Sequence, residues 1–363
     1  MISRAFLIYR IVRQRFSVYV SPIFTALFFL GLRALVWVGQ ALDMLLYPKL
    51  RDIKIQSPIV IVGAPRTGST FLQRFLHLHQ LGLGQTVLQQ VYPSIFLQKM
   101  LSPFTPLLEK ISPARHHSSV AHQTSLASIE TDDAGIFLRF LDGFFLYGFL
   151  LSWAEEDLKY LVDPDNHPTF KRDVDWWEKA WKRNLLQHQQ ERVLVKSFSL
   201  MVNLPQFQKR YPDAKCLVLL RDPLEMVPSA LSLVSGVLEK RFRISRLDRD
   251  IQERFYQRLS GALLELLEKF VENWNAGRIK KSSVLFVPYP RLISDFENMM
   301  EDILLFTCTE KSAELTKIIQ QTAQKQKSYQ SKHQYSLEQF GLNEALLQEK
   351  SSFFYHFMEE QCG

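Results

Sequence analysis

The feature that most constrains the fold is a glycine-containing loop between a short apolar run and an amphipathic stretch. Residues 59–63 read IVIVG, a β-branched run of the kind that parallel sheets bury on both faces. The loop that follows, GAPRTGST (residues 63–70), has the spacing of a phosphate-binding loop, and residues 70–78 then place apolar side chains at helical intervals. This order of strand, loop and helix predicts an anion site at the carboxyl end of the strand.

Further apolar runs are each followed by a helical pattern. They are residues 192–197 (RVLVKS), 215–223 (KCLVLLRDP) and 283–289 (SVLFVPY), and the last leads into residues 292–306, which again have a helical pattern. Strands that alternate with helices build a parallel sheet with helices on both faces. The predicted fold class is α/β, a P-loop-like parallel sheet flanked by helices, with an N-terminal apolar helical segment before it. Residues 98–123, rich in proline, serine and histidine, are predicted to form a mobile or substrate-facing loop.

The residue types of the first loop suit a phosphate group. The backbone N–H groups of Thr67, Gly68, Ser69 and Thr70 would point into one concavity at the positive end of the following helix. Nucleoside triphosphatases need a lysine in the place of Ser69, because it bridges the β- and γ-phosphates. Here Arg66 supplies the positive charge instead. The loop therefore predicts a phosphate ligand other than a magnesium-bound nucleoside triphosphate.

The next strands carry polar residues to the same edge of the predicted sheet. Lys196 ends the second strand, Arg221 ends the third, and Ser229 lies near the start of the helix after it. Because the carboxyl ends of parallel strands form one crevice, Arg221 and Ser229 could hold a second phosphate beside the first. A structural ion pair of Arg221 with Asp222, and a surface position for Lys196, are the simpler alternatives.

These motifs together resemble the sulfotransferases that use 3′-phosphoadenylyl sulfate (PAPS). GAPRTGSTFLQ, VLVKS, LVLLRDPLEMVPSALS and YSLEQFGL are similar to the bacterial branch and, more distantly, to the protein-tyrosine sulfotransferases. The resemblance covers residues 59–342. It implies that the 5′-phosphosulfate binds to Arg66, Thr67, Gly68, Ser69, Thr70 and Phe71. It also implies that Arg221 and Ser229 bind the 3′-phosphate, and that Lys332 lies in a segment that closes over the nucleotide. A solvated polar linker around Lys332 is the alternative.

Sulfuryl transfer needs fixed positive groups where charge develops on the transferring group. We expect Arg66 and Lys196 to supply them, and the tyrosine-sulfating relatives have a lysine that matches Lys196. A catalytic metal is not expected.

The base that takes the acceptor proton is harder to assign. In the tyrosine-sulfating relatives it is a glutamate beyond the first helix, but the corresponding stretch here, GQTVLQQVYP, contains no acid. The next candidates are His122, Glu130, Asp132 and Asp133. Acids at these positions can equally begin a helix and stabilise its dipole.

The first 50 residues differ from the rest of the chain. Four arginines (Arg4, Arg10, Arg13 and Arg15) precede residues 16–32, which are uncharged, and no acidic residue precedes Asp43. A cleaved signal peptide fits poorly, because no small-residue cleavage site closes a short apolar core. A helix lying on the membrane, broken at Pro22 and Gly31, a single-pass anchor and a pair of ordinary core helices remain open. We predict a membrane-associated segment over residues 1–50 and a sulfotransferase-like α/β domain over residues 51–363.

Composition narrows the partners but does not choose among them. The net charge of +7 indicates an anionic partner, and 3 cysteines at unrelated spacings argue against a disulfide framework. We expect an amphiphilic or lipid-like sulfate acceptor, a membrane surface contacted by residues 1–50, no nucleic acid, and a peripheral cytoplasmic location. The alternative from another class is a non-catalytic, nucleotide-regulated, membrane-associated binding protein. A phosphoryl transferase is disfavoured by Ser69.

Overall fold

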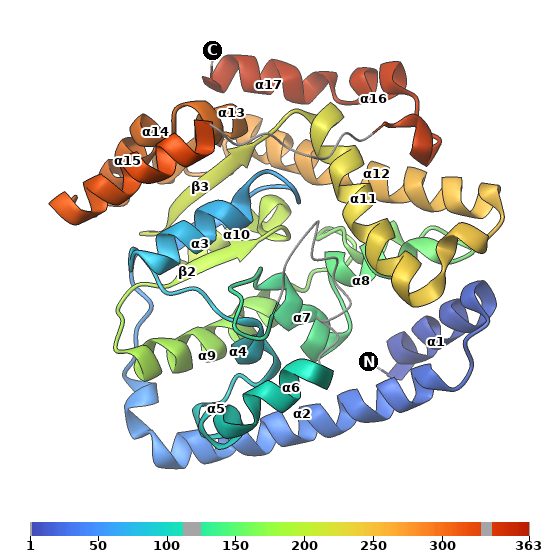
Figure 1. Cartoon of the computed structure of the whole chain (residues 1–363), viewed down its shortest axis with the longest axis horizontal. Helices are drawn as coiled ribbons and strands as arrows, with labels where there is room; N and C mark the ends of the chain where they lie inside the picture. Colours follow the sequence, from blue (N-terminus) through green and yellow to red (C-terminus); the bar gives the residue numbers. More distant parts are fainter. Residues whose placement is uncertain (1, 112–124, 328–335, 363) are drawn as a thin grey trace. The chain divides into compact units, whose positions relative to one another are not determined.

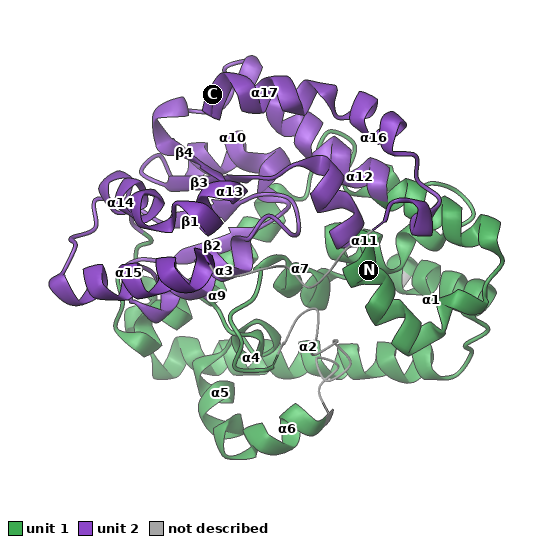
Figure 2. Ribbon diagram, turned by 45° about the horizontal axis from the view of Figure 1, so that its top comes forward, with its two compact units in different colours: residues 1–55, 85–191, 231–259 green, residues 56–84, 192–230, 260–363 purple. Residues whose placement is uncertain are grey.

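The computed structural model describes residues 2–111, 125–327 and 336–362 (Figure 1). Contacts within the chain group it into two compact units (Figure 2). Unit 1 comprises residues 1–55, 85–191 and 231–259, and unit 2 comprises residues 56–84, 192–230 and 260–363. The predicted boundary at residue 50 separates a membrane-associated segment from the sulfotransferase-like α/β domain, and this division stays a prediction.

Unit 2 contains a parallel sheet of four strands. Their spatial order is β2 (Leu194–Ser197), β1 (Ile59–Val62), β3 (Lys215–Leu220) and β4 (Val284–Pro288). Every neighbouring pair is parallel, so the carboxyl ends of the strands share one edge. Each strand lies inside an apolar run identified in the sequence, and the predicted α/β fold is confirmed.

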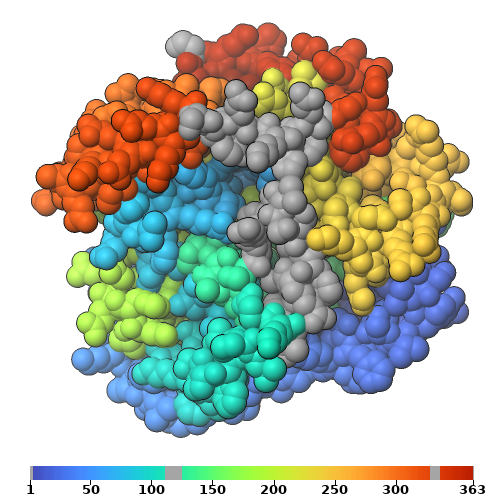
Figure 3. Space-filling model, in the orientation of Figure 1, coloured from blue at the N-terminus to red at the C-terminus, as the bar shows by residue number. Residues whose placement is uncertain are grey.

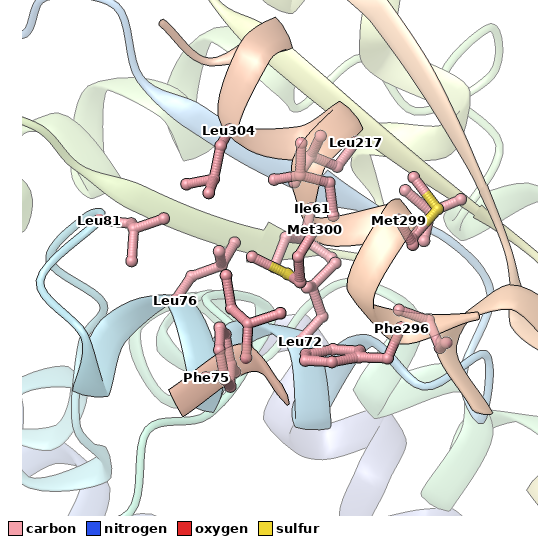
Figure 4. Packing of buried hydrophobic residues seen from close by; sticks show 14 of the residues in the cluster. Ile61, Leu72, Phe75, Leu76, Leu81, Leu217, Phe296, Met299, Met300 and Leu304 are labelled. Carbon is pink, nitrogen blue, oxygen red and sulfur yellow. The ribbon is translucent and has the colours of Figure 1, made fainter. Parts of the chain in front are cut away.

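One face of the sheet packs against α3 (Ser69–Leu78), α14 (Phe296–Phe306) and α15 (Ala313–Lys327). Figure 4 shows Ile61 and Leu217 from the sheet among the side chains of the helices. All residues of this cluster are buried, so the face forms a continuous apolar core.

The other side chains of the strands point to the opposite face, because successive strand residues alternate. Phe286 of β4 makes edge-on ring contacts with Phe270, Trp274 and Phe357. These rings belong to α12 (Arg249–Asn275) and α17 (Ser352–Cys362). The remaining helices with residues in unit 2 are α10 (Leu200–Arg210), α11 (Pro223–Phe242), α13 (Tyr289–Ser294) and α16 (Glu344–Lys350). The sheet therefore has helices on both faces, as predicted.

The helical pattern predicted over residues 292–306 is confirmed, and it is divided between α13 and α14 at Asp295. The Asp295 backbone is non-helical, with φ −132° and ψ 37°. Its carboxylate accepts hydrogen bonds from Arg291 on one side and Asn298 on the other. The Asp295 side chain thus joins the last turn of α13 to the first turn of α14.

Unit 1 is largely helical. It contains α1 (Ile2–Phe16), α2 (Ser21–Leu46), α4 (Val87–Val91), α5 (Ile95–Leu101), α6 (Thr105–Ile111), α7 (Asp133–Phe140), α8 (Phe144–Phe149) and α9 (Phe170–His188). Pro22 lies in the first turn of α2, where proline is tolerated, and Gly31 lies inside the helix without breaking it. The expected break at Gly31 is therefore wrong.

The loop predicted over residues 98–123 is also wrong for its first part. Residues 98–111 lie in α5, in the short helix Ser102–Phe104 and in α6, and residues 112–124 lie outside the described residues. Ser94 caps α5 by accepting a hydrogen bond from the N–H of Leu97. Pro103 occupies a helix start, which needs no N–H donor. Proline here marks where helices begin rather than where helical structure is lost.

Candidate functional site

The loop between β1 and α3 turns sharply and lies close to β3. Arg66 and Gly68 have left-handed backbones, with φ 71° and 87°. A side-chain carbon at Gly63 would lie 3.0 Å from Oγ1 of Thr67 and 3.1 Å from the carbonyl oxygen of Leu219, so only glycine fits there comfortably. Buried Thr67 donates from Oγ1 to the carbonyl of Ala64 over 2.9 Å. The loop is thus a compact turn that ends at the amino terminus of α3, where helical N–H groups lack helical partners.

Three residues predicted to bind phosphates lie together, Arg66 within this loop and Arg221 and Ser229 next to it. The Nε of Arg66 donates to Oγ of Ser229 over 3.0 Å. The Nη1 of Arg221 donates to the backbone carbonyl of Arg66 over 2.6 Å. Ser229 is buried, whereas both arginines are partly exposed. Two guanidinium groups, a hydroxyl and a helix amino terminus therefore gather at one edge of the sheet.

Arg221 is also held by two residues that the sequence did not single out. Its Nε and Nη2 both donate to one carboxylate oxygen of Glu225, over 3.1 and 3.0 Å. Its guanidinium lies 4.1 Å from the centre of the Tyr289 ring, at the start of α13. Glu225 lies four residues after Arg221, in the first turn of α11, which begins at Pro223. Tyr289 follows β4, so the strand-edge rule could have identified it.

The neighbouring Asp222 does not form the ion pair considered for it. One of its carboxylate oxygens accepts a hydrogen bond from the N–H of Leu224 over 2.8 Å and another from the hydroxyl of Tyr355. Burial and the nearby Asp222 carboxylate raise the pKa of the Tyr355 hydroxyl. Asp222 therefore fixes the turn that carries Arg221, while the carboxylate that pairs with Arg221 belongs to Glu225.

Lys196 is a buried residue of the sheet rather than a surface lysine. It is 2% exposed and stands beside Ile61 of β1 in the parallel register. Its Nζ donates to Oγ1 of Thr70, in the first turn of α3, over 2.9 Å. Burial of an ammonium group is unfavourable unless polar partners surround it. The hydroxyl of Thr70 is such a partner, and it holds the Lys196 ammonium next to the loop.

The other predicted donor-binding residues have different surroundings. Ser69 is buried in the first turn of α3, and Gly68 precedes it. The ring of Phe71 lies 5.5 Å from that of Phe296 and is partly buried against the core. Lys332 lies outside the described residues. The assignments of these residues to the donor stay predictions.

The candidate bases that the structure describes are Glu130, Asp132 and Asp133, and all three are buried residues of unit 1. His122 lies outside the described residues, and Glu130 is buried. Asp132 accepts a hydrogen bond from Trp181 over 2.9 Å, and Asp133 accepts one from Thr131 over 2.7 Å as α7 begins. Only Asp133 lies in the first turn of α7, as the helix-start interpretation expects, and the assignment of the base stays a prediction.

Gln89 occupies the stretch in which the tyrosine-sulfating relatives carry their glutamate, and it has a structural use. Its Oε1 accepts a hydrogen bond from the N–H of Thr86, while the hydroxyl of Thr86 accepts one from the N–H of Gln89. This reciprocal pair caps α4. The Nε2 of Gln89 donates to Oδ1 of Asn184 over 2.7 Å, a bond that a carboxylate could not donate. The Gln89 amide thus both caps α4 and bonds to α9.

Unit 2 also contains a cavity of about 680 Å³. Its lining includes Leu224, three residues after Arg221, and the C-terminal segment around Ser336, Gly341 and Asn343. Cavities of this volume hold small-molecule ligands. Within the described ranges, no three His, Cys, Asp or Glu side chains gather closely enough to hold a metal ion. The expectation that catalysis needs no metal stays a prediction.

The sequence profile of the sulfotransferase family matches residues 58–314, which is most of the chain. The chain therefore belongs to the sulfotransferase family. A search of curated proteins gave no significant match.

Solved structures agree with this fold. Sulfotransferase STF1 from Mycobacterium tuberculosis is 19% identical, with 89% of this chain and 84% of that chain covered and a TM-score of 0.63. Sulfotransferase STF9 from Mycobacterium avium is 16% identical, with 89% of this chain and 81% of that chain covered and a TM-score of 0.68. At these identities the likeness concerns the fold alone.

Proposed function

We propose that this protein transfers the sulfuryl group of PAPS to a hydroxyl or amine of a lipid-like acceptor. Membership of the sulfotransferase family supports sulfuryl transfer in general. The observation that favours PAPS is the cluster of Arg66, Arg221 and Ser229 at the amino terminus of α3. Guanidinium groups form strong, often forked contacts with phosphates, so Arg66 and Arg221 can each bind one of the two phosphate groups of this donor.

Each residue of the cluster has a distinct part in this proposal. The loop amides and Arg66 bind the 5′-phosphosulfate, and Arg221 with Ser229 binds the 3′-phosphate. The sulfur–oxygen bond to the phosphate breaks as the acceptor oxygen or nitrogen bonds to sulfur, and a base takes the acceptor proton. Lys196, held beside Thr70, stabilises negative charge on the group in transfer. The bisphosphate then leaves with the phosphate oxygen that carried the sulfuryl group.

The donor assignment predicts a clear order of nucleotide affinities. Adenosine 3′,5′-bisphosphate should bind far more tightly than ATP, and magnesium should not strengthen its binding, because Ser69 replaces the lysine that triphosphatases use. Isothermal calorimetry with each nucleotide, with and without magnesium, measures this order. Tighter binding of ATP, or binding that depends on magnesium, would overturn the donor assignment.

Glu225 should compete with the 3′-phosphate for Arg221. Glu225→Gln is expected to strengthen bisphosphate binding about two- to threefold, because a ligand no longer displaces a carboxylate that is 58% exposed and therefore only weakly paired. Glu253→Gln removes the same charge from the i,i+4 pair of α12 and serves as the matched control. Equal affinities for Glu225→Gln and wild type in calorimetry would show that Glu225 does not compete with the 3′-phosphate for Arg221.

We also propose that residues 1–50 bring the enzyme to the cytoplasmic surface of a membrane, where it meets its amphiphilic acceptor. The support is α2, which is long and apolar enough to cross a bilayer. Core helices of soluble proteins and signal sequences can have the same length and composition. Only 17% of the most apolar window of α2 is buried, however, whereas a core helix is mostly buried.

The rival proposal is a non-catalytic protein that binds a nucleotide at the same loop and associates with membranes. The amide of Gln89 favours it, because an amide in the position of the relatives' glutamate cannot take a proton. Retention of the buried Lys196 beside the loop favours catalysis. Turnover distinguishes the two proposals, since both predict nucleotide binding.

A further inference from the structure

One face of α2 is apolar and exposed along the whole helix. Between Ser21 and Leu46 the sequence contains only two charged residues, Arg33 and Asp43. Large apolar side chains recur at helical spacing on the exposed side, and they include Ile23, Leu27, Leu30, Trp37 and Leu45. Trp37 is 66% exposed and Leu45 is 78% exposed. Atoms of α2, in blue, are visible at the surface in Figure 3.

The opposite face of α2 packs against the rest of unit 1, the unit to which the helix itself belongs. The buried residues of the helix are Leu32, Val36, Gly39 and Asp43, which share one side. A side-chain carbon at Gly39 would lie 2.5 Å from Leu97 of α5, so the two helices approach too closely for any larger residue. This packing places the exposed apolar side chains of α2 on the side that faces away from the rest of unit 1.

Polar contacts fix the same orientation. Oδ2 of Asp43 accepts hydrogen bonds from Nε of Arg183 over 2.7 Å and from the N–H of Ile95 over 3.1 Å. Nη2 of Arg33 donates to the carbonyl of Leu138 over 3.3 Å. Removing α2 from unit 1 would leave the buried Arg183 without its carboxylate. A membrane-spanning α2 would either break these bonds or place α5 and α9 in hydrocarbon, and both are unfavourable.

Basic residues flank the apolar face at both ends. Arg10 and Arg13 are exposed shortly before α2, and Lys49 and Arg51 are exposed shortly after it. Asp52 is the one exposed acidic residue within the first 55 residues. Exposed cations beside an apolar helix face complement anionic lipid headgroups above a hydrocarbon layer.

We propose that α2 lies in the plane of a membrane containing anionic lipid, with Ile23, Leu27, Leu30, Trp37 and Leu45 inserted and unit 1 above the surface. This inference rests on the membrane association proposed above and specifies its geometry. It excludes the single-pass orientation, because one face of α2 is already occupied by protein.

Vesicle binding tests the inserted face. The full chain is sedimented with neutral phosphatidylcholine vesicles and with vesicles that also contain phosphatidylglycerol. The double variant Leu27→Gln with Leu30→Gln should reduce the partition coefficient at least tenfold, since two inserted leucines are lost. The control is Leu305→Gln with Leu346→Gln, two exposed leucines of unit 2, and it should bind like wild type. Equal loss in both double variants would overturn the assignment of the face.

Accessibility of the two ends of α2 tests the in-plane orientation. Gln14→Cys and Asp52→Cys place a thiol at an exposed position before and after the helix, with Cys308 and Cys362 changed to serine. In sealed membranes from expressing cells, an impermeant maleimide should label both thiols from the same side. Labelling of only one thiol until detergent is added would show a membrane span and overturn the proposal.

Other outcomes separate this inference from the proposed activity. Protein that stays soluble with both vesicle types, yet binds adenosine 3′,5′-bisphosphate, would overturn membrane association and leave the donor proposal intact. A dimer in light scattering that the Leu27→Gln and Leu30→Gln changes dissociate, without vesicle binding, would assign the face to a second copy of the chain. Membrane binding without nucleotide binding would support the in-plane helix and overturn the donor proposal.

Discussion

Replacing Lys196 by methionine is expected to reduce turnover roughly a hundredfold while the affinity for adenosine 3′,5′-bisphosphate stays nearly unchanged. The Lys196 ammonium is buried beside Thr70, where desolvation strengthens its attraction for developing negative charge. A contact that strengthens in the transition state appears in the rate rather than in ground-state binding. Methionine keeps the apolar stem within the sheet, so we expect the fold to persist.

The comparison needs a matched lysine and a measure of folding. Lys209→Met changes an exposed lysine of α10 and should leave both turnover and binding at the wild-type level. Thermal unfolding of the Lys196→Met protein, with and without bisphosphate, separates a loss of catalysis from a loss of structure. Normal turnover by folded Lys196→Met would show that Lys196 supports the sheet and not the reaction.

Arg221→Ala should have the opposite signature, with its main effect on nucleotide binding. Hydrogen bonds to a charged group contribute about 1.5–3 kcal/mol, so losing the contact with the 3′-phosphate should weaken bisphosphate binding by roughly 10- to 150-fold. Adenosine 5′-phosphosulfate lacks that phosphate and should lose much less affinity. Calorimetry with both ligands gives the ratio of the two losses.

The ratio matters because Arg221 also supports the loop. Its bond to the Arg66 carbonyl disappears in the alanine variant, and a looser loop would bind every nucleotide less well. Arg221→Lys keeps the charge but loses the forked contact and the planar group over Tyr289, so it should be intermediate. Equal losses for the two ligands would mean that Arg221 shapes the loop and does not contact the 3′-phosphate.

Much of unit 2 could be predicted because two simple rules apply to it directly. One rule concerns the apolar runs of buried parallel strands, and the other concerns the residues at the carboxyl ends of those strands. Strands buried on both faces of a parallel sheet have continuous apolar runs, and residues 59–62 and 216–220 provide them. The strand-edge rule placed Arg221 near the loop, and the structure joins it to the Arg66 carbonyl. Lys196 follows the same rule, since it lies one residue before the end of β2.

The remaining features depend on contacts that a linear pattern does not contain. In the sequence, Gln89 stands in the stretch where a catalytic base was expected. Its hydrogen bonds to Thr86 and Asn184, which give it a structural use, are known only from the structure. The proline-rich stretch reads as a loop because proline marks helix starts as well as turns, and α6 begins there. Apolar periodicity in α2 predicts a helix, but the side that faces protein follows from Asp43 and Arg183.

Transfer of labelled sulfate is the most direct test of the central claim, which is PAPS-dependent sulfuryl transfer to an amphiphilic acceptor. The protein is incubated with lipid and metabolite extracts and with donor carrying a heavy sulfur isotope, and the products are identified by mass spectrometry. We predict a labelled product in the lipid fraction, one adenosine 3′,5′-bisphosphate released per transfer, and a roughly hundredfold smaller yield with Lys196→Met. Tight donor binding without any labelled product in either fraction would contradict the claim and favour the non-catalytic alternative.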